Sequence, residues 1–152
     1  MSLEDLYKEV ILDHYKNPRN KRDLPGAVLS CSRNNPLCGD EITVNALVED
    51  GKVLEVTFEG QGCSISQASA SMMTEAVTGR TVEDALKLVA DFRTFMEGKL
   101  DPSEEEFGDL MALKGVVRYP VRIKCAVLAW DVLQEALDER DGTAAGAAPH
   151  SG

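Results

Sequence analysis

The sequence lacks most of the motifs that hydrolysis or nucleic-acid binding requires. It has two histidines, and neither belongs to a His-x-Glu or His-Glu-x-x-His pattern of the kind found in zinc hydrolases. It also has no glycine loop that would cradle phosphate. Basic residues are few, since 16 Lys and Arg stand against 26 Asp and Glu and the net charge is −10. Because nucleic-acid surfaces need clustered Lys and Arg, nucleic acid is not an expected partner.

Long apolar runs and a signal pattern are also missing. No apolar run approaches the roughly 20 residues of a membrane span, and residues 1–9 are amphipathic and acidic rather than basic and apolar. We therefore expect a cytoplasmic protein with no membrane partner, in which thiols stay reduced. The four cysteines of a secreted chain would suggest two disulfides, with three pairings open. That interpretation is less favoured, because it gives no shared reason for the glycines and the aspartate beside the cysteines.

Hydrophobic periodicity predicts an α+β fold, with a small antiparallel sheet of about three strands packed with helices. Apolar residues at helical spacing predict a first helix that Ser2 caps and that ends before Pro18. Alternating residues on both sides of Asp50-Gly51 predict a hairpin with one face buried. The other predicted elements are a strand at 27–30, helices at 65–77 and 85–96, one or two short helical turns in 103–113, and a last helix from 121 or 125 to 137.

The length of 152 residues suits one domain that buries its own core. We assign residues 1–140 to this domain, since the sequence contains neither an internal repeat nor a second predicted core. Residues 141–152 are small, polar and proline-containing, and we expect a disordered tail there.

Sulfur chemistry is concentrated in three short segments, each of which places a thiol at a turn or an element boundary. The segments are Asn35-Pro36-Leu37-Cys38-Gly39-Asp40, Gly60-Gln61-Gly62-Cys63 and Arg122-Ile123-Lys124-Cys125. Three thiolates and one carboxylate form a four-ligand set suited to a soft or borderline metal such as zinc or iron. Because oxygen is the weaker ligand for such a metal, a site that includes Asp40 can open.

The surroundings of the cysteines favour a ligand role to different degrees. Cys63 directly precedes an amphipathic helix, where the positive end of the helix dipole favours a thiolate. Cys38 and Asp40 flank a glycine and can point into one space; taken alone, Cys38 fits equally well as a buried thiol beside an Asp turn. Cys125 follows Lys124, and a neighbouring ammonium favours a thiolate. Taken alone, Cys125 fits better as a core thiol.

Three further residues have reactive side chains but are not expected to take part. Cys31 has no glycine or acidic neighbour, and we interpret it as incidental rather than as a ligand. His14 falls on the apolar face of the first predicted helix, which is typical of a structural histidine with satisfied hydrogen bonds. His150 lies in the predicted tail. A site with many thiols and few acid-base groups suits sulfur handling better than hydrolysis.

Four segments together resemble the IscU/SufU (NifU N-terminal-like) iron–sulfur cluster assembly family. They are Asp13-His14-Tyr15-Lys16-Asn17-Pro18-Arg19-Asn20, Asn35 to Asp40, Gly60 to Ser71 and Ile123-Lys124-Cys125. The resemblance covers residues 3–140. It implies a SufE/NifU-like α+β fold with the three cysteines gathered at one end. It also implies a cysteine desulfurase as partner, and it places Cys38, Asp40, Cys63 and Cys125 at the family's metal or cluster positions.

Two departures from the scaffold pattern resemble the SufU branch of this family. Lys124 stands where IscU scaffolds carry His, and the 62 positions from Cys63 to Cys125 leave room for a helical stretch that IscU lacks. The family's Leu-Pro-Pro-Val-Lys chaperone signal aligns with Arg118-Tyr119-Pro120-Val121-Arg122. Since the Leu and the first Pro are absent, the resemblance does not support recruitment of an Hsp70-type chaperone.

The resemblance implies a zinc-bound sulfur acceptor, which takes persulfide sulfur from the desulfurase and is a carrier rather than a stand-alone enzyme. Its four metal residues would be Cys38, Asp40, Cys63 and Cys125, with Cys125 as the candidate sulfur acceptor. The alternative is a scaffold on which the same residues hold iron or a transient [2Fe–2S] cluster for apo-acceptor proteins. A third interpretation is a zinc site that only stabilises the fold. The spacing of the ligands does not separate zinc from iron.

Overall fold

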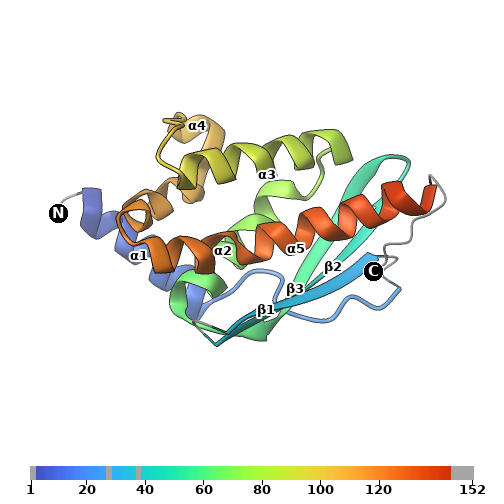
Figure 1. The fold of residues 1–152 in the computed structure, drawn as a ribbon, viewed down its shortest axis with the longest axis horizontal. Helices are drawn as coiled ribbons and strands as arrows, with labels where there is room; N and C mark the ends of the chain where they lie inside the picture. Colours follow the sequence, from blue (N-terminus) through green and yellow to red (C-terminus); the bar gives the residue numbers. More distant parts are fainter. Residues whose placement is uncertain (1–2, 27–28, 37–38, 145–152) are drawn as a thin grey trace.

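A three-stranded antiparallel sheet with helices packed against it forms the core of the fold in the computed structural model, which describes residues 3–26, 29–36 and 39–144. The strands follow in the order β1-β2-β3, and α5 runs along the sheet (Figure 1). The strands are β1 (Leu29–Asn35), β2 (Asp40–Glu49) and β3 (Lys52–Gln61). The helices are α1 (Leu3–Lys16), α2 (Ser64–Val77), α3 (Val82–Met96), α4 (Glu104–Phe107), the 3-10 helix η1 (Gly108–Arg118) and α5 (Pro120–Ala144). The α+β prediction is confirmed.

The predicted hairpin joins β2 to β3. Asp50 has φ 53° and Gly51 has φ 74°, the left-handed conformations that a tight hairpin turn needs. A register shift between Leu47 and Val48 interrupts the ladder near this turn. β1 continues to Asn35, which is further than predicted, and pairs along its length with β2. β1 is an edge strand, and most of its side chains are polar and exposed. It therefore lacks the alternation of apolar and polar residues by which a strand is recognised in a sequence.

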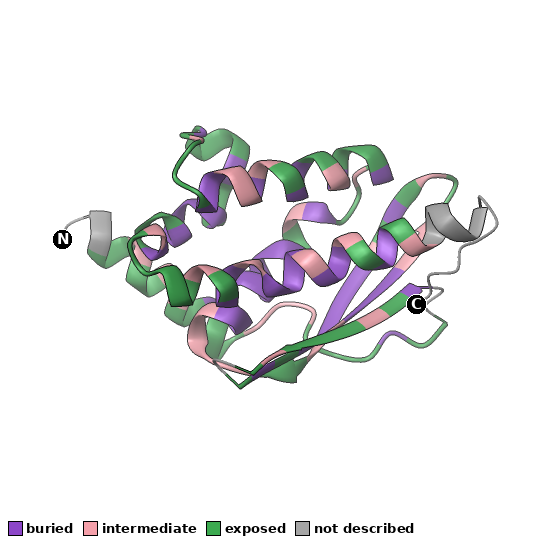
Figure 2. Cartoon of the chain, in the orientation of Figure 1, coloured by how far each residue is buried: buried purple, intermediate pink, exposed green. Residues whose placement is uncertain are grey.

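The two helices α2 and α5 cover the sheet and carry much of the buried surface (Figure 2). Trp130 of α5 is fully buried and stacks on Phe92 of α3, with ring centroids 4.4 Å apart. Its indole Nε1 donates a hydrogen bond to Ser69 Oγ of α2 at 3.0 Å. Ser69 Oγ in turn donates to the Ala126 carbonyl at 2.6 Å. One aromatic residue therefore joins three helices without leaving its polar atom unpaired.

His14 joins α1 to two other elements. Its imidazole is fully buried, with Nδ1 2.8 Å from Ser71 Oγ of α2 and Nε2 2.8 Å from Asp109 Oδ2 of η1. The Arg19 backbone N–H also donates to Ser71 Oγ at 2.8 Å, which leaves the hydroxyl hydrogen for Nδ1. In that tautomer Nε2–H donates to Asp109. The prediction of a structural histidine is confirmed.

The segment after α3 is longer and more regular than predicted. Ser103 and Glu106 form a capping box at the start of α4, and the chain then continues as a 3-10 helix to Arg118. Leu110, Leu113 and Val116 are buried at intervals of three, which matches three residues per turn. A search for the 3.6-residue period misses this pattern.

The last helix begins at Pro120 and ends at Ala144. It therefore extends beyond residue 141, where the tail was predicted to begin, and residues 145–152 lie outside the described part of the chain. The predicted helix cap at Ser2 and the predicted strand residues 27–28 lie outside it as well. Within the described ranges, every helix is too short or too polar to cross a bilayer.

Replacing Gly60 tests the close approach of β3 to β2. Gly60 has φ +127°, and a Cβ at this position would lie 1.9 Å from the Glu41 carbonyl oxygen. We expect Gly60→Ala to lower the free energy of unfolding by about 2 kcal/mol or more, from backbone strain and overpacking. Denaturant unfolding followed by circular dichroism measures the change. Gly115→Ala is the control, since its Cβ would meet nothing within 4 Å; equal midpoints for the two variants would contradict the prediction.

Candidate metal centre

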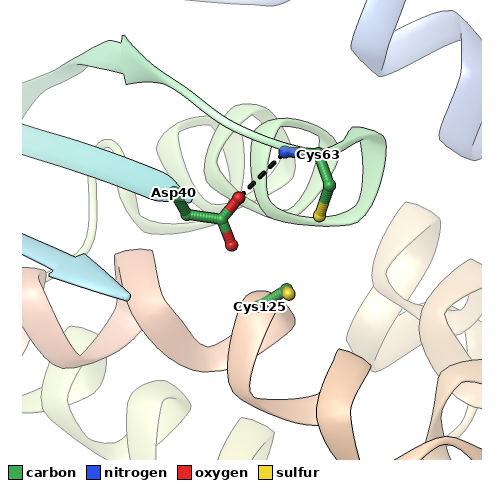
Figure 3. Close-up of side chains that lie close together, drawn as sticks. All are labelled: Asp40, Cys63 and Cys125. Carbon is green, nitrogen blue, oxygen red and sulfur yellow. Dashed lines mark hydrogen bonds between the residues drawn. The ribbon is translucent and has the colours of Figure 1, made fainter. Parts of the chain in front are cut away.

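Three of the four predicted ligands converge from different elements. Asp40 opens β2, Cys63 caps α2 and Cys125 lies on α5. One ligand atom from each lies within 4.8 Å of the others. Figure 3 shows the two sulfurs and the second carboxylate oxygen facing a common space. The fourth predicted ligand, Cys38, lies outside the described residues.

Asp40 supplies the oxygen of the site. Its side chain is buried, and Oδ1 accepts a hydrogen bond from the Cys63 backbone N–H at 2.9 Å. Oδ2 is also buried, yet within the described residues it has no hydrogen-bond partner. A buried carboxylate oxygen without a partner is costly. A cation at the centre of the three side chains would compensate Oδ2, so this atom fits a metal site.

Gly62 makes room for this carboxylate. A Cβ on Gly62 would lie 2.3 Å from Asp40 Oδ1 and 2.5 Å from Ser66 Oγ. Any other residue here would force the carboxylate away from the Cys63 N–H. The glycine beside the cysteine in the sequence is therefore explained by packing within the site.

Cys63 is the N-cap of α2, as its position in the sequence predicted. Its backbone is extended, and its Sγ accepts a hydrogen bond from the Ser66 N–H at 3.5 Å. The N-terminus of α2 therefore presents an N–H and the positive end of the helix dipole to this sulfur. The side chain is half-buried. A sulfur in this position can serve as a metal ligand and as a nucleophile.

Cys125 is more deeply placed than its sequence position suggested. It is fully buried, and its Sγ donates to the Val121 carbonyl at 3.7 Å. Since α5 begins at Pro120, Cys125 lies in the second turn of the helix. The predicted position at the helix boundary is therefore wrong. Part of the core-thiol interpretation holds, because the side chain is enclosed, but its sulfur faces the other two ligands.

Arg122 is a site residue that the sequence analysis did not identify, because Lys124 is the cation adjacent to Cys125 in the sequence. The pKa of Arg122 is raised, first by its hydrogen bond with Cys125 and then by the negative charges of Cys63 and Cys125. The signal was available, because residues three apart on a helix share a face. Arg122 is exposed, and its guanidinium lies close to both sulfurs of the site.

Cys31 lies on β1 and outside this group of ligands. Its Sγ is 3.5 Å from Glu139 Oε2 of α5. Burial, the hydrogen bond with Glu139 and its negative charge raise the pKa of Cys31 to about 11. A thiol in these surroundings stays protonated at neutral pH. Cys31, Cys63 and Cys125 are all free of disulfide bonds.

A second group of potential ligands, formed by His14, Glu75 and Asp109, has a structural explanation. Their ligand atoms also lie within 4.8 Å of one another. Both ring nitrogens of His14 are already hydrogen-bonded, and Glu75 lies 4.0 Å from the Arg19 guanidinium. These contacts join α1, α2 and η1, so the three side chains lie close together for a structural reason.

Comparison with known proteins gives matches over most of the chain. The model of the NifU-like N-terminal domain matches residues 6–144. The zinc-dependent sulfurtransferase SufU of Bacillus subtilis is 45% identical over 141 residues, which cover 93% of this chain and 95% of SufU. The iron–sulfur cluster assembly scaffold protein IscU of Streptococcus pyogenes is 42% identical over 135 residues, covering 89% of this chain and 84% of IscU.

A solved structure gives the same fold. The crystal structure of a hypothetical protein superposes on this chain with a TM-score of 0.83, and the two sequences are 41% identical. The match covers 90% of this chain and 99% of the other. The resemblance drawn from the sequence motifs is confirmed.

Replacing Gly62 tests whether Asp40 must be held in place for metal binding. In Gly62→Ala the new methyl group displaces the Asp40 carboxylate, and we expect zinc affinity to fall roughly 10–100-fold, as for other residues that orient a ligand. Competition with a chromogenic chelator measures the affinity, and circular dichroism confirms the fold. Gly115→Ala is the matched control. Unchanged zinc affinity in folded Gly62→Ala would contradict the prediction.

Proposed function

The chain belongs to the family of NifU-like N-terminal domains, and from this membership we propose that it serves iron–sulfur cluster assembly as a zinc-bound acceptor of sulfur from a cysteine desulfurase. The observation that carries the proposal is the convergence of Asp40, Cys63 and Cys125 around a buried carboxylate oxygen that has no partner among the residues the structure describes. The similarity to a protein named as a zinc-dependent sulfurtransferase supports it.

The donor set fits zinc. Asp40, Cys63 and Cys125 would hold the ion, and the family resemblance supplies Cys38 as the fourth ligand. Zinc, when bound, keeps coordinating thiols ionised at neutral pH. The chain itself contributes two positive groups beside the sulfurs, the N-terminus of α2 and the Arg122 guanidinium.

Sulfur transfer then requires one thiolate of the site to reach the donor. The thiolate attacks the outer sulfur of the desulfurase persulfide, so that a new S–S bond forms on this chain. The S–S bond of the donor breaks, and the donor cysteine leaves as a thiolate. No oxidant is consumed, because the transferred sulfur keeps its oxidation level.

Which cysteine accepts the sulfur stays a prediction. The family resemblance points to Cys125, but the fully buried Cys125 would need the first turn of α5 to move before it met a donor. Cys63 is half-buried and lies at the N-terminus of α2, and its greater exposure than that of Cys125 favours it. Cys38 is the third candidate.

The alternative function is that of a scaffold for a [2Fe–2S] cluster. One observation favours it, the 42% identity to a protein named as an IscU scaffold. Anaerobic incubation with iron and sulfide distinguishes the two functions. A stable visible chromophore that transfers to an apo-protein supports the scaffold, whereas stoichiometric zinc with stimulation of a desulfurase supports the sulfur acceptor.

The main experiment combines elemental analysis with a desulfurase assay. We expect the purified chain to hold one zinc and to accelerate sulfide release from L-cysteine by its desulfurase. Serine variants of Cys38, Cys63 and Cys125 should each lose this effect, while Cys31→Ser keeps it. Mass spectrometry after alkylation identifies the cysteine that carries the extra sulfur. If metal removal unfolds the chain and the three variants still accept sulfur, the zinc has a structural role and the proposal fails.

Asp40 variants test the role of the weak ligand. We expect Asp40→Ala to slow sulfur transfer roughly tenfold, because the oxygen ligand that such a metal holds least firmly is lost and the ion is left on the three thiolates. Asp40→Asn is the matched control, because its amide oxygen still accepts the Cys63 N–H while the anionic oxygen is lost. A loss of transfer in both variants assigns the effect to the carboxylate charge. Unaltered transfer by both would contradict this role.

A further inference from the structure

An apolar groove of about 1110 Å³ opens beside the metal centre. Its walls come from α1, the first turn of α2, the end of α3, η1 and the start of α5. The apolar lining includes Tyr7 and Ile11 of α1, Phe95 of α3, Val116 of η1 and Tyr119. This volume lies at the upper end of the roughly 300–1,000 Å³ of small-molecule pockets, so the groove has room for a segment of polypeptide.

The charge of the groove opposes that of the whole chain. Its lining contains five cations, Lys8, Lys99, Lys114, Arg118 and Arg122, and among the described residues a single carboxylate, Asp101. The chain as a whole has 26 acidic and 16 basic residues. Asp101 lies 3.4 Å from Lys114, and Glu97 lies 3.8 Å from Lys99, so these two carboxylates offset only part of the positive charge. The groove is thus a basic and apolar surface on an acidic protein.

The groove leads to the sulfur ligands. Ile65, which lines it, stands two residues after Cys63 in the first turn of α2. Arg122 lines it as well and is hydrogen-bonded to Cys125. A chain that occupies the groove therefore lies beside the first turn of α2, which Cys63 caps, and beside Arg122.

We propose that this groove binds a segment of the sulfur-donating desulfurase that carries apolar side chains flanked by carboxylates, and that this docking brings the donor persulfide to the thiols at the end of the groove. The proposal rests on the proposed function, since it names the surface by which the same donor is held. Complementary charge on the rim speeds association and sets orientation, while apolar side chains on the floor supply the affinity.

Tyr119 is a suitable apolar anchor for such a segment. It is 59% exposed, although aromatic side chains of this size are usually more buried. Exposed aromatic residues in apolar patches mark interaction sites. Because Tyr119 contributes little to the core, its replacement leaves the fold intact.

Charge reversal on the rim tests the docking surface. Lys8→Glu/Lys99→Glu alters two groove cations that are distant in sequence from the sulfur ligands, and Lys52→Glu/Lys87→Glu makes the same change of net charge outside the groove. We expect the groove variant to raise the concentration of this chain needed for half-maximal stimulation of the desulfurase roughly tenfold or more, and to weaken its salt dependence. Maximal stimulation at saturation and zinc content should match those of the unaltered chain. An equal loss in both variants, or a loss in neither, would overturn the proposal.

Tyr119 provides an independent test. Tyr119→Ala should weaken binding to the desulfurase while leaving the unfolding midpoint within error. A photoreactive phenylalanine analogue at position 119 should crosslink to a desulfurase peptide that contains Asp or Glu next to an apolar residue. A crosslink only to a second copy of this chain, or to a peptide without carboxylates, would overturn the proposed occupant.

The two proposals fail in different ways. If the unaltered chain neither binds zinc nor stimulates the desulfurase, the proposed function is wrong. If the unaltered chain does both and the groove variants behave like their controls, the function stands and the groove is not the docking surface.

Discussion

The hydrogen bond from the Cys63 backbone N–H to Asp40 Oδ1 is the constraint on which the metal centre depends. It ties the first residue of β2 to the N-cap of α2, and it uses one carboxylate oxygen while leaving the other buried and without a partner among the described residues. The bond exists only because Gly62 has no Cβ, since a methyl group there would overlap Oδ1. Backbone geometry, rather than the ligands alone, therefore sets the position of the oxygen ligand.

Local signals in the sequence were sufficient for most of the fold. The turn at Asp50-Gly51 and the position of Cys63 directly before a helix each depend on neighbours within a few positions, and each is present in the structure. β1 and η1 were harder to predict. β1 is an edge strand with polar outward residues, and η1 repeats every three residues, so neither shows the periods of a buried strand or an α-helix.

The site was predictable as a set of residues but not as a geometry. Motif resemblance selected Asp40, Cys63 and Cys125, which the fold brings together. The depth of Cys125 and the participation of Arg122 depend on where α5 begins, and helix starts are poorly defined by sequence. The groove could not be foreseen either, because its walls come from segments distant in sequence.

The buried imidazole of His14 has a consequence for recognition. It joins α1, α2 and η1 at one point, and these elements also wall the groove. These two hydrogen bonds hold three walls of the groove together before it is filled, which lowers the conformational entropy that a bound segment would cost them. A single interior ring thus links the groove to α2, the helix that Cys63 caps.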